Sequence, residues 1–198
     1  MAKIFHRYLE EAFFSFRDRR YWFLGSFPSV LVKEAFGRID TEYDVDYFYG
    51  GKGNRFWPTL ARLFFRVGVV DSERLLMGWG RKEAIEERKH LLVVGDLGIT
   101  DLYMEIESEG KASDRNIVPL RWNPYLEEIV LRAEVLFVTS HYVASHLRKA
   151  FQNKEEIQQK IVCLPSPSPL SRLTGYTDEK LERKYEEMFS LFLPVFRK

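Results

Sequence analysis

The sequence predicts a single α/β domain with a three-layer α/β/α architecture, in which helices cover both faces of a mostly parallel, four-stranded sheet. Three short apolar runs, at 21–24, 135–139 and 161–164, have the length of buried strands, and residues 99–106 alternate between apolar and polar as a strand does. Helical segments separate these strands, and parallel neighbours need such crossovers. The chain contains no internal repeat and no linker, so we expect one domain over residues 1–198.

The N-terminal third combines two helices with a long loop. Apolar residues at helical spacing predict a helix over about residues 3–16, packed on the domain. After the strand at 21–24, residues 26–53 contain one proline and four glycines and predict a long loop, which in a compact domain is usually functional. A helix is expected over 55–67, where Pro58 is tolerated because it lies in the first turn.

The remaining helices alternate with the remaining strands. They are expected at 81–92, 123–132, 141–151 and 177–191, the last with Thr177 as its N-cap. Ligands of parallel α/β sheets bind outside the carboxyl ends of the strands. The loops after Leu24 and Leu164 are therefore the expected place for a site.

Composition excludes several kinds of site. A single cysteine, Cys163, cannot form an internal disulfide, a zinc site with several cysteines or an iron–sulfur cluster. The four histidines do not cluster, so we expect no metal ion and no cofactor. The net charge of +1 does not indicate nucleic acid by itself, although basic residues gather near 17–20, 55–66 and 148–154. Each basic group is also consistent with a solvated helix face.

No segment indicates a membrane or a secretory route. The hydrophobic fraction of 45% suits a globular protein, and no run of 18 apolar residues occurs. The first residues lack the apolar stretch and cleavage site of a signal peptide. We expect a cytoplasmic monomer.

The first candidate site segment is Gly-Ser-Phe-Pro-Ser at residues 25–29, directly after the first predicted strand. Small residues such as Gly25 and Ser26 let the backbone approach a ligand closely. An ordinary turn would have the same composition, so this segment is not decisive by itself.

The second segment is Tyr-Gly-Gly-Lys-Gly-Asn-Arg-Phe-Trp at residues 49–57. A glycine loop that enters a helix can bind phosphate with its backbone N–H groups, although the spacing is not that of a Walker A loop. Asn54 stands at the helix start, where N-capping is the ordinary role of this residue type.

The third segment is Leu-Pro-Ser-Pro-Ser-Pro-Leu-Ser-Arg at residues 164–172, after the last predicted strand. It is a stiff loop with hydroxyl and backbone donors, and such donors suit phosphate oxygens. Proline reduces the entropy that such a loop loses when it becomes ordered on a ligand.

Together the three segments resemble the uracil-DNA glycosylase superfamily. The Asn-Arg-Phe-Trp stretch and the loop at 164–172 are similar to those of the mismatch-specific uracil/thymine-DNA glycosylases, and the opening at 24–29 is more similar to the hypoxanthine-DNA glycosylase branch. Gly-Ile-Thr-Asp at 98–101 and Ser-Asp-Arg-Asn-Ile at 113–117 also match stretches of the superfamily. The resemblance covers roughly residues 20–190, and its specificity comes from the order and spacing of the motifs.

This resemblance implies an enzyme that flips a deaminated base, uracil or hypoxanthine, out of DNA and hydrolyses its N-glycosidic bond. The implied partner is DNA with a damaged or mismatched base. The mismatch-specific branch has a catalytic Asn in its first motif, where this chain has Phe27. The hypoxanthine branch also lacks that Asn and relies on the Asn of the second motif, so the resemblance to it implies that Asn54 is the catalytic residue. The implied base-binding residues are Tyr49, Gly25, Ser26 and Phe27, and the implied DNA-backbone contacts are Ser166, Ser168, Ser171 and Arg172.

Other interpretations stay open on the sequence alone. The chain is also consistent with a superfamily member that binds nucleic acid or a nucleotide without cleavage, or with a phosphate-binding enzyme that uses the glycine loop at 50–53. Asp44, Asp46 and Asp101 are candidate carboxylates for positioning water, although a structural or solvated role is the first expectation for each.

Overall fold

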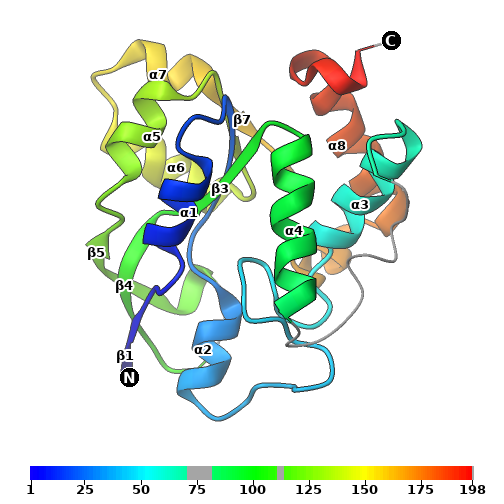
Figure 1. Ribbon diagram of the computed structural model, residues 1–198. Coiled ribbons are helices and arrows are strands. Elements are labelled where there is room, and N and C mark those ends of the chain that lie inside the picture. The colour runs from blue at the N-terminus through cyan, green and yellow to red at the C-terminus, as the bar shows by residue number, and fades with distance from the viewer. Residues whose placement is uncertain (71–81, 111–113, 198) are drawn as a thin grey trace.

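A computed structural model describes residues 1–70, 82–110 and 114–197. It shows a parallel sheet as the middle one of three layers, with helices on either side (Figure 1). The sheet has the order β3-β2-β6-β7, and all of its neighbouring strands run parallel. Its strands are β2 (Tyr21–Gly25), β3 (Leu97–Asp101), β6 (Val135–Val138) and β7 (Ile161–Cys163). The predicted three-layer α/β/α fold with a four-stranded sheet is confirmed.

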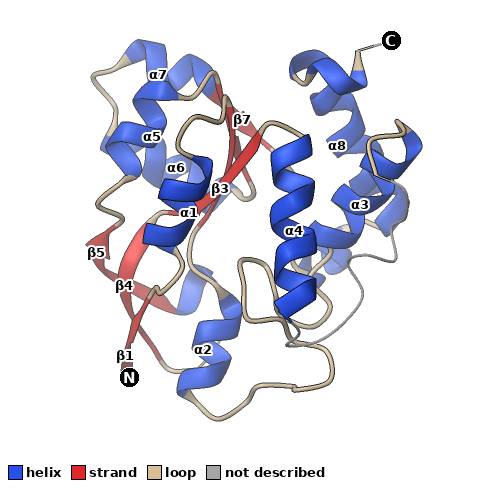
Figure 2. Cartoon of the chain, viewed as in Figure 1, coloured by secondary structure: helices blue, strands red, loops and turns tan. Residues whose placement is uncertain are grey.

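Helices cover both faces of this sheet (Figure 2). One face carries α1 (Leu9–Phe16), α5 (Leu126–Arg132), α6 (His141–Ala150) and α7 (Glu155–Lys160). The other carries α3 (Phe56–Arg66), α4 (Lys82–Val94) and α8 (Asp178–Phe192). Every residue of β2, β3 and β6 is buried, as expected for strands with helices on both sides.

Aromatic side chains join the sheet to the α3/α8 layer. Phe23 of β2 meets Phe56 of α3 edge-on at a centroid distance of 4.9 Å, and Phe137 of β6 meets Phe189 of α8 at 5.4 Å. All four rings are fully buried. Much of the aromatic content of the chain is therefore core, where each large ring stabilises the fold by its buried area.

A second sheet was not predicted from the sequence. It is antiparallel, with the order β1-β4-β5, and consists of β1 (Ala2–Phe5), β4 (Tyr103–Ser108) and β5 (Ile117–Trp122). The N-terminal helix predicted over 3–16 is therefore only α1, because the residues before it pair with β4. Apolar periodicity over so few residues does not distinguish a strand from a helical turn.

The strand predicted at 99–106 is in fact two strands in different sheets. The break lies at Leu102, whose N–H donates to the Gly25 carbonyl at 3.0 Å. Asn123 fixes the bend from the other side, since its Nδ2 donates to Thr100 Oγ1 at 2.8 Å and to the Asp101 carbonyl at 2.9 Å. These hydrogen bonds join residues that are far apart in the sequence. The local pattern of apolar and polar residues therefore could not predict the break.

Four further points compare the predicted helices with the observed ones. The loop predicted over 26–53 contains the short helix α2 (Ser29–Ala35), and α7 was not predicted at all. The helix expected from residue 81 is α4, and residue 81 itself lies outside the described residues. Thr177 caps α8 as predicted, because its Oγ1 accepts the Lys180 N–H at 3.3 Å. Among the described helices, none is long and apolar enough to span a bilayer.

The parallel sheet brings the carboxyl ends of its strands together. Gly25 at the end of β2 lies opposite Asp101 at the end of β3, and Val138 of β6 lies opposite Cys163 of β7. The loops that follow β2, β6 and β7 therefore leave the sheet at one edge, where ligands of such sheets bind.

Candidate functional site

A cavity of about 300 Å³ lies at this edge of the sheet. Its wall is made by residues 25–29, 51–52, 139–140 and 166–170, together with Lys33, Tyr49, Asn54, Asp101, Asp114 and Val143. It includes seven residues expected from the sequence to act together: Gly25, Ser26, Phe27, Tyr49, Asn54, Ser166 and Ser168. Segments more than a hundred residues apart thus meet in one small space.

Gly25 gives the cavity its depth. A Cβ at this position would lie 2.2 Å from Asp101 Oδ1 and 2.7 Å from the Tyr49 hydroxyl, closer than non-bonded atoms approach. The space that a side chain would fill is therefore taken by the two polar groups at the bottom of the cavity. This close approach is the physical reason for glycine at the end of β2.

Tyr49 is held in an unusual backbone conformation and a fixed ring position. Its φ is 51°, in the left-handed region that non-glycine residues rarely adopt. Phe56 stacks on its ring at a centroid distance of 4.2 Å and an interplanar angle of 22°, and its hydroxyl bonds Thr139 Oγ1 at 2.9 Å. Burial raises the pKa of Tyr49 well above its ordinary value, so the hydroxyl keeps its proton. Such local strain clusters at functional sites.

The loop before Tyr49 is ordered around Asp44, which is fully buried. Its carboxylate accepts hydrogen bonds from Lys33 Nζ at 2.5 Å, from the Lys52 backbone N–H at 2.5 Å and from the Asp40 backbone N–H at 2.8 Å. Asp46 binds the side chains of Arg7 and Tyr8. Both carboxylates therefore have structural partners, and neither is among the described residues that line the cavity.

The position of Asn54 is compatible with both roles that the sequence left open. Its Oδ1 accepts the Phe56 N–H at 2.9 Å, which caps the start of α3. The same residue lines the cavity. Because the cap uses only the amide oxygen, the orientation of the side chain is fixed and the Nδ2 group remains a donor for a ligand.

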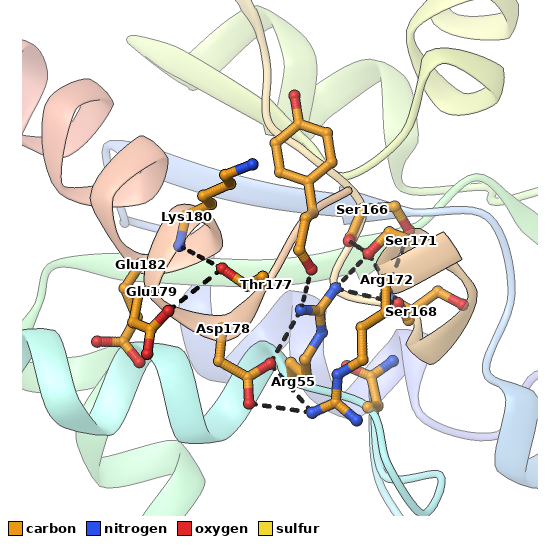
Figure 3. A network of polar contacts seen from close by, with 12 residues as sticks. Arg55, Ser166, Ser168, Ser171, Arg172, Thr177, Asp178, Glu179, Lys180 and Glu182 are labelled. Atoms are coloured by element: carbon orange, nitrogen blue, oxygen red, sulfur yellow. Dashed lines mark hydrogen bonds and ion pairs between the residues drawn. The ribbon is translucent and has the colours of Figure 1, made fainter. Parts of the chain in front are cut away.

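The loop after β7 is held from inside by Arg55, the residue next to Asn54 (Figure 3). The buried guanidinium binds the Ser171 hydroxyl, donates to the Tyr176 carbonyl at 2.7 Å and pairs with Asp178 Oδ1 at 3.0 Å. The Arg55 backbone N–H donates to the Pro167 carbonyl at 2.9 Å. The start of α3, the loop and the start of α8 are thus fixed to one another.

The four residues expected to contact the DNA backbone are placed differently. Ser166 and Ser168 line the cavity. Ser171 is buried, with its hydroxyl within hydrogen-bond distance of the Ser166 carbonyl (2.7 Å) and the Ser168 carbonyl (2.9 Å). Ser171 therefore shapes the loop from inside. Arg172 is 55% exposed and forms a two-pronged ion pair with Asp178, with both distances 3.0 Å.

Two further carboxylates line the cavity, of which Asp114 had no site role predicted from the sequence and Asp101 only a candidate one. The sequence showed Asp114 only as part of a motif. Its carboxylate accepts hydrogen bonds from Ser26 Oγ at 2.5 Å and from Ser140 Oγ at 3.0 Å. Asp101 was only one of three candidate carboxylates, and its Oδ2 lies 3.0 Å from Nε2 of the buried His6. His6 carried no sequence signal, because its contact is 95 residues away.

A larger groove of about 860 Å³ lies beside the cavity and shares part of its wall. The shared residues include Asp114, Ser140, Ser166 and Leu170. Leu170 is 59% exposed, although it is apolar and stands beside the cavity. Across the described residues, no group of three or more His, Cys, Asp or Glu side chains is arranged to hold a metal ion.

Comparison with known proteins bears on the fold. No protein-family model and no curated protein matches the chain. The structure is similar to the solution NMR structure of a "putative uracil DNA glycosylase" from Methanosarcina acetivorans, at a TM-score of 0.55 and 18% sequence identity. The match covers 86% of this chain and 91% of that chain. This chain therefore has a uracil-DNA-glycosylase-like fold, with its cavity at the carboxyl edge of the parallel sheet.

Proposed function

We propose that this protein is a monofunctional DNA-base glycosylase, which flips a deaminated base, uracil or hypoxanthine, into the cavity and hydrolyses its N-glycosidic bond. The observation that carries the proposal is the meeting of the residues 25–27, Tyr49, Asn54 and the serines of the 166–168 loop around one small cavity. The fold shared with the archaeal protein supports it, and so do the sequence motifs. A base in a duplex reaches such a cavity only after flipping.

The cavity suits a flat, polar ring. Tyr49 offers an aromatic surface that Phe56 supports from behind, and stacking of a base on such a surface contributes about 1–3 kcal/mol. Phe27 lines the same cavity and packs edge-on against His6 at 5.3 Å. The volume of about 300 Å³ lies at the lower end of small-molecule sites.

Cleavage of the glycosidic bond leaves negative charge on the departing base and positive charge on the sugar. Donors that point at the base lower the barrier, because they stabilise this charge as it forms. The Nδ2 group of Asn54 is such a donor, on a side chain that the cap to Phe56 holds in place. No covalent intermediate is required, and water is the only other reactant.

In this proposal the loop after β7 holds the DNA around the flipped nucleotide. The hydroxyls of Ser166 and Ser168 line the cavity, and phosphate contacts of this kind set position and affinity rather than base choice. Arg172 is exposed close to them in the sequence. The exposed Leu170 has the character of the apolar wedges that proteins insert between base steps. We therefore propose that the exposed part of this loop contacts the DNA strand next to the flipped nucleotide.

The phosphate-binding alternative loses support in the structure. A glycine loop binds phosphate through free backbone N–H groups. Here the Lys52 N–H donates to Asp44, the Gly50 N–H to the Tyr47 carbonyl, and the Asn54 N–H to the Gly51 carbonyl. These donors are used within the loop, and the buried carboxylate would repel a phosphate.

The direct test is a panel of oligonucleotides that carry uracil, hypoxanthine, xanthine or mismatched thymine, in single and double strands, assayed for alkali-labile abasic sites without added metal. We expect cleavage at uracil or hypoxanthine. If the protein shifts every oligonucleotide in a gel but leaves no abasic site at high enzyme concentration, it is a binding protein and the glycosylase proposal fails. Turnover of free nucleotides instead would favour the phosphate-binding alternative.

A further inference from the structure

We propose that Asp101 is the carboxylate that holds the attacking water, and that the buried His6 is the residue that positions it. This inference rests on the proposed glycosylase function, selects Asp101 from the three candidate carboxylates of the sequence and adds His6, which no motif includes. It starts from an unusual buried pair, in which the N-terminal segment before α1 reaches the last residue of β3.

The two carboxylate oxygens of Asp101 have different surroundings. Oδ2 accepts a hydrogen bond from His6 Nε2 at 3.0 Å. Oδ1 lies over Gly25 at the cavity floor, in the space where a Cβ would be only 2.2 Å away. The residue is 3% exposed and lines the cavity. One oxygen is thus held by His6, while the other lies beside Gly25 in the wall of the cavity.

The protonation of His6 follows from its second contact. The Tyr8 backbone N–H donates to Nδ1 at 3.2 Å, so Nδ1 carries no proton. The ring is then neutral, its proton is on Nε2, and this N–H donates to Asp101. Burial lowers the pKa of His6, which agrees with a neutral ring. Phe27 and Phe48 pack against the ring at 5.3 and 5.2 Å and fix its position.

Asp101 is consequently a buried carboxylate whose partner is neutral. Among the described residues, no lysine or arginine forms an ion pair with it. Burial raises the pKa of Asp101, and the nearby Asp114 raises it further, while His6 and the backbone of Gly25 lower it. An unneutralised carboxylate inside a fold is costly, and such groups concentrate at functional sites.

The other carboxylates of this region are less suited to the role. Asp114 lines the cavity, but both of its oxygens accept serine hydroxyls, from Ser26 and Ser140. Asp44 and Asp46 have strong partners outside the cavity lining. Asp101 is the carboxylate with an oxygen directed to the cavity floor and a partner that leaves its negative charge in place.

The reaction then balances as a hydrolysis. The C1′–N bond breaks and its electron pair leaves with the base, while a water oxygen forms a bond to C1′. The proton of that water passes to Asp101 and from there to solvent, and the base anion takes a proton from water. Before attack, the negative charge of Asp101 stabilises the cation on the sugar.

The test compares Asp101→Asn, His6→Phe, the double variant and a control, Asp46→Asn, which removes a carboxylate that binds the same N-terminal segment. Single-turnover rates and DNA affinity are measured from pH 5 to 9. We expect Asp101→Asn to slow base release by on the order of 10²–10⁴, the usual contribution of a general base. DNA affinity should stay close to that of the wild type. The wild type should lose rate at acid pH as Asp101 takes up a proton, and Asp101→Asn should lack this dependence.

His6→Phe should slow the reaction on the order of 10- to 100-fold, the effect of a misplaced group, with His6→Gln partly restoring the rate through its amide N–H. In the Asp101→Asn background, His6→Phe should have no further effect, because a positioning residue acts only through its partner. ¹⁵N NMR of histidine should show the Nε2–H form for His6.

An active wild type whose rate and pH profile are unchanged in Asp101→Asn would overturn this inference and leave the glycosylase function standing. A further loss from His6→Phe in the Asp101→Asn background would show that His6 is structural. A wild type with no activity on any oligonucleotide would overturn the function and this inference together.

Discussion

The guanidinium of Arg55 binds the hydroxyl of Ser171, and this contact ties the residue next to Asn54 to the loop that follows β7. Asp178 completes the connection, because it pairs with Arg55 and with Arg172 and its pKa is lowered, first of all by Arg55. Arg55 and Asp178 therefore fix the loop after β7 to the starts of α3 and α8 (Figure 3). The stability of this connection is open to direct measurement.

Replacing Arg55 by methionine should destabilise the fold by about 3 kcal/mol, because several buried acceptors and Asp178 lose their partner at once. Urea unfolding measures this change. Arg17→Met is the control, since Arg17 forms an exposed pair with Glu128 and such pairs contribute about 0–1 kcal/mol. Equal losses in the two variants would contradict the central role of Arg55.

The two roles of Asn54 can be separated with two substitutions. Asn54→Ala removes both the cap and the amide donor, whereas Asn54→Asp keeps an oxygen for the Phe56 N–H and removes the donor. We expect both variants to lose on the order of 10²–10³ in single-turnover rate. Only Asn54→Ala should lose about 1 kcal/mol of stability, the usual value of a cap. An aspartate variant with the wild-type rate would return Asn54 to a capping role.

Arg172→Ala should weaken the binding of all DNA substrates by similar factors and leave base preference unchanged. If Arg172 contacts a phosphate, the slope of log K against log salt should fall by about one unit. Arg183→Ala is the matched control, since Arg183 pairs only loosely with Glu187 along α8. Unchanged affinity and salt slope in Arg172→Ala would show that Arg172 serves Asp178 alone.

The buried His6 predicts a stability that depends on pH. Burial lowers its pKa below the ordinary 6.5, so the folded protein resists the proton that the unfolded chain accepts. The contribution of His6 to the free energy of unfolding is complete above pH 6.5. It is lost as the pH falls, by up to about 1.4 kcal/mol per pH unit.

This slope is best measured in Asp101→Asn, since the raised pKa of Asp101 contributes with the opposite sign. Urea unfolding between pH 7.5 and 5 should then show the decline, and His6→Phe in the same background should remove it. A decline that persists without His6 would assign it to other groups.

The strands of the central sheet and the cap at Thr177 were predictable because they depend on local patterns. Buried apolar runs identify β2, β6 and β7, and a threonine before a polar helix start identifies the cap. The small antiparallel sheet was not predictable, since its strands are short and pair across about a hundred residues.

The candidate site shows the same division. Tyr49, Asn54 and the serines of the 166–168 loop could be expected near one another, from their loops at strand and helix ends and from the resemblance, and they line one cavity. His6 and Asp101 were not brought together, because their contact depends on how the N-terminal segment crosses the end of β3. Ser171 has the same side chain as Ser166 and Ser168, and only the packing of Arg55 against it reveals its internal position.

The close approach at Gly25 has a consequence for sequence variation. Because Asp101 and Tyr49 share the volume that a Cβ at position 25 would need, the three positions cannot vary independently. In a library randomised at all three, alanine at position 25 should survive selection for activity only beside a smaller partner at 49 or 101. During evolution, positions 25, 49 and 101 would then change in pairs. A protein that replaced Gly25 first would be inactive until position 49 or 101 had also changed.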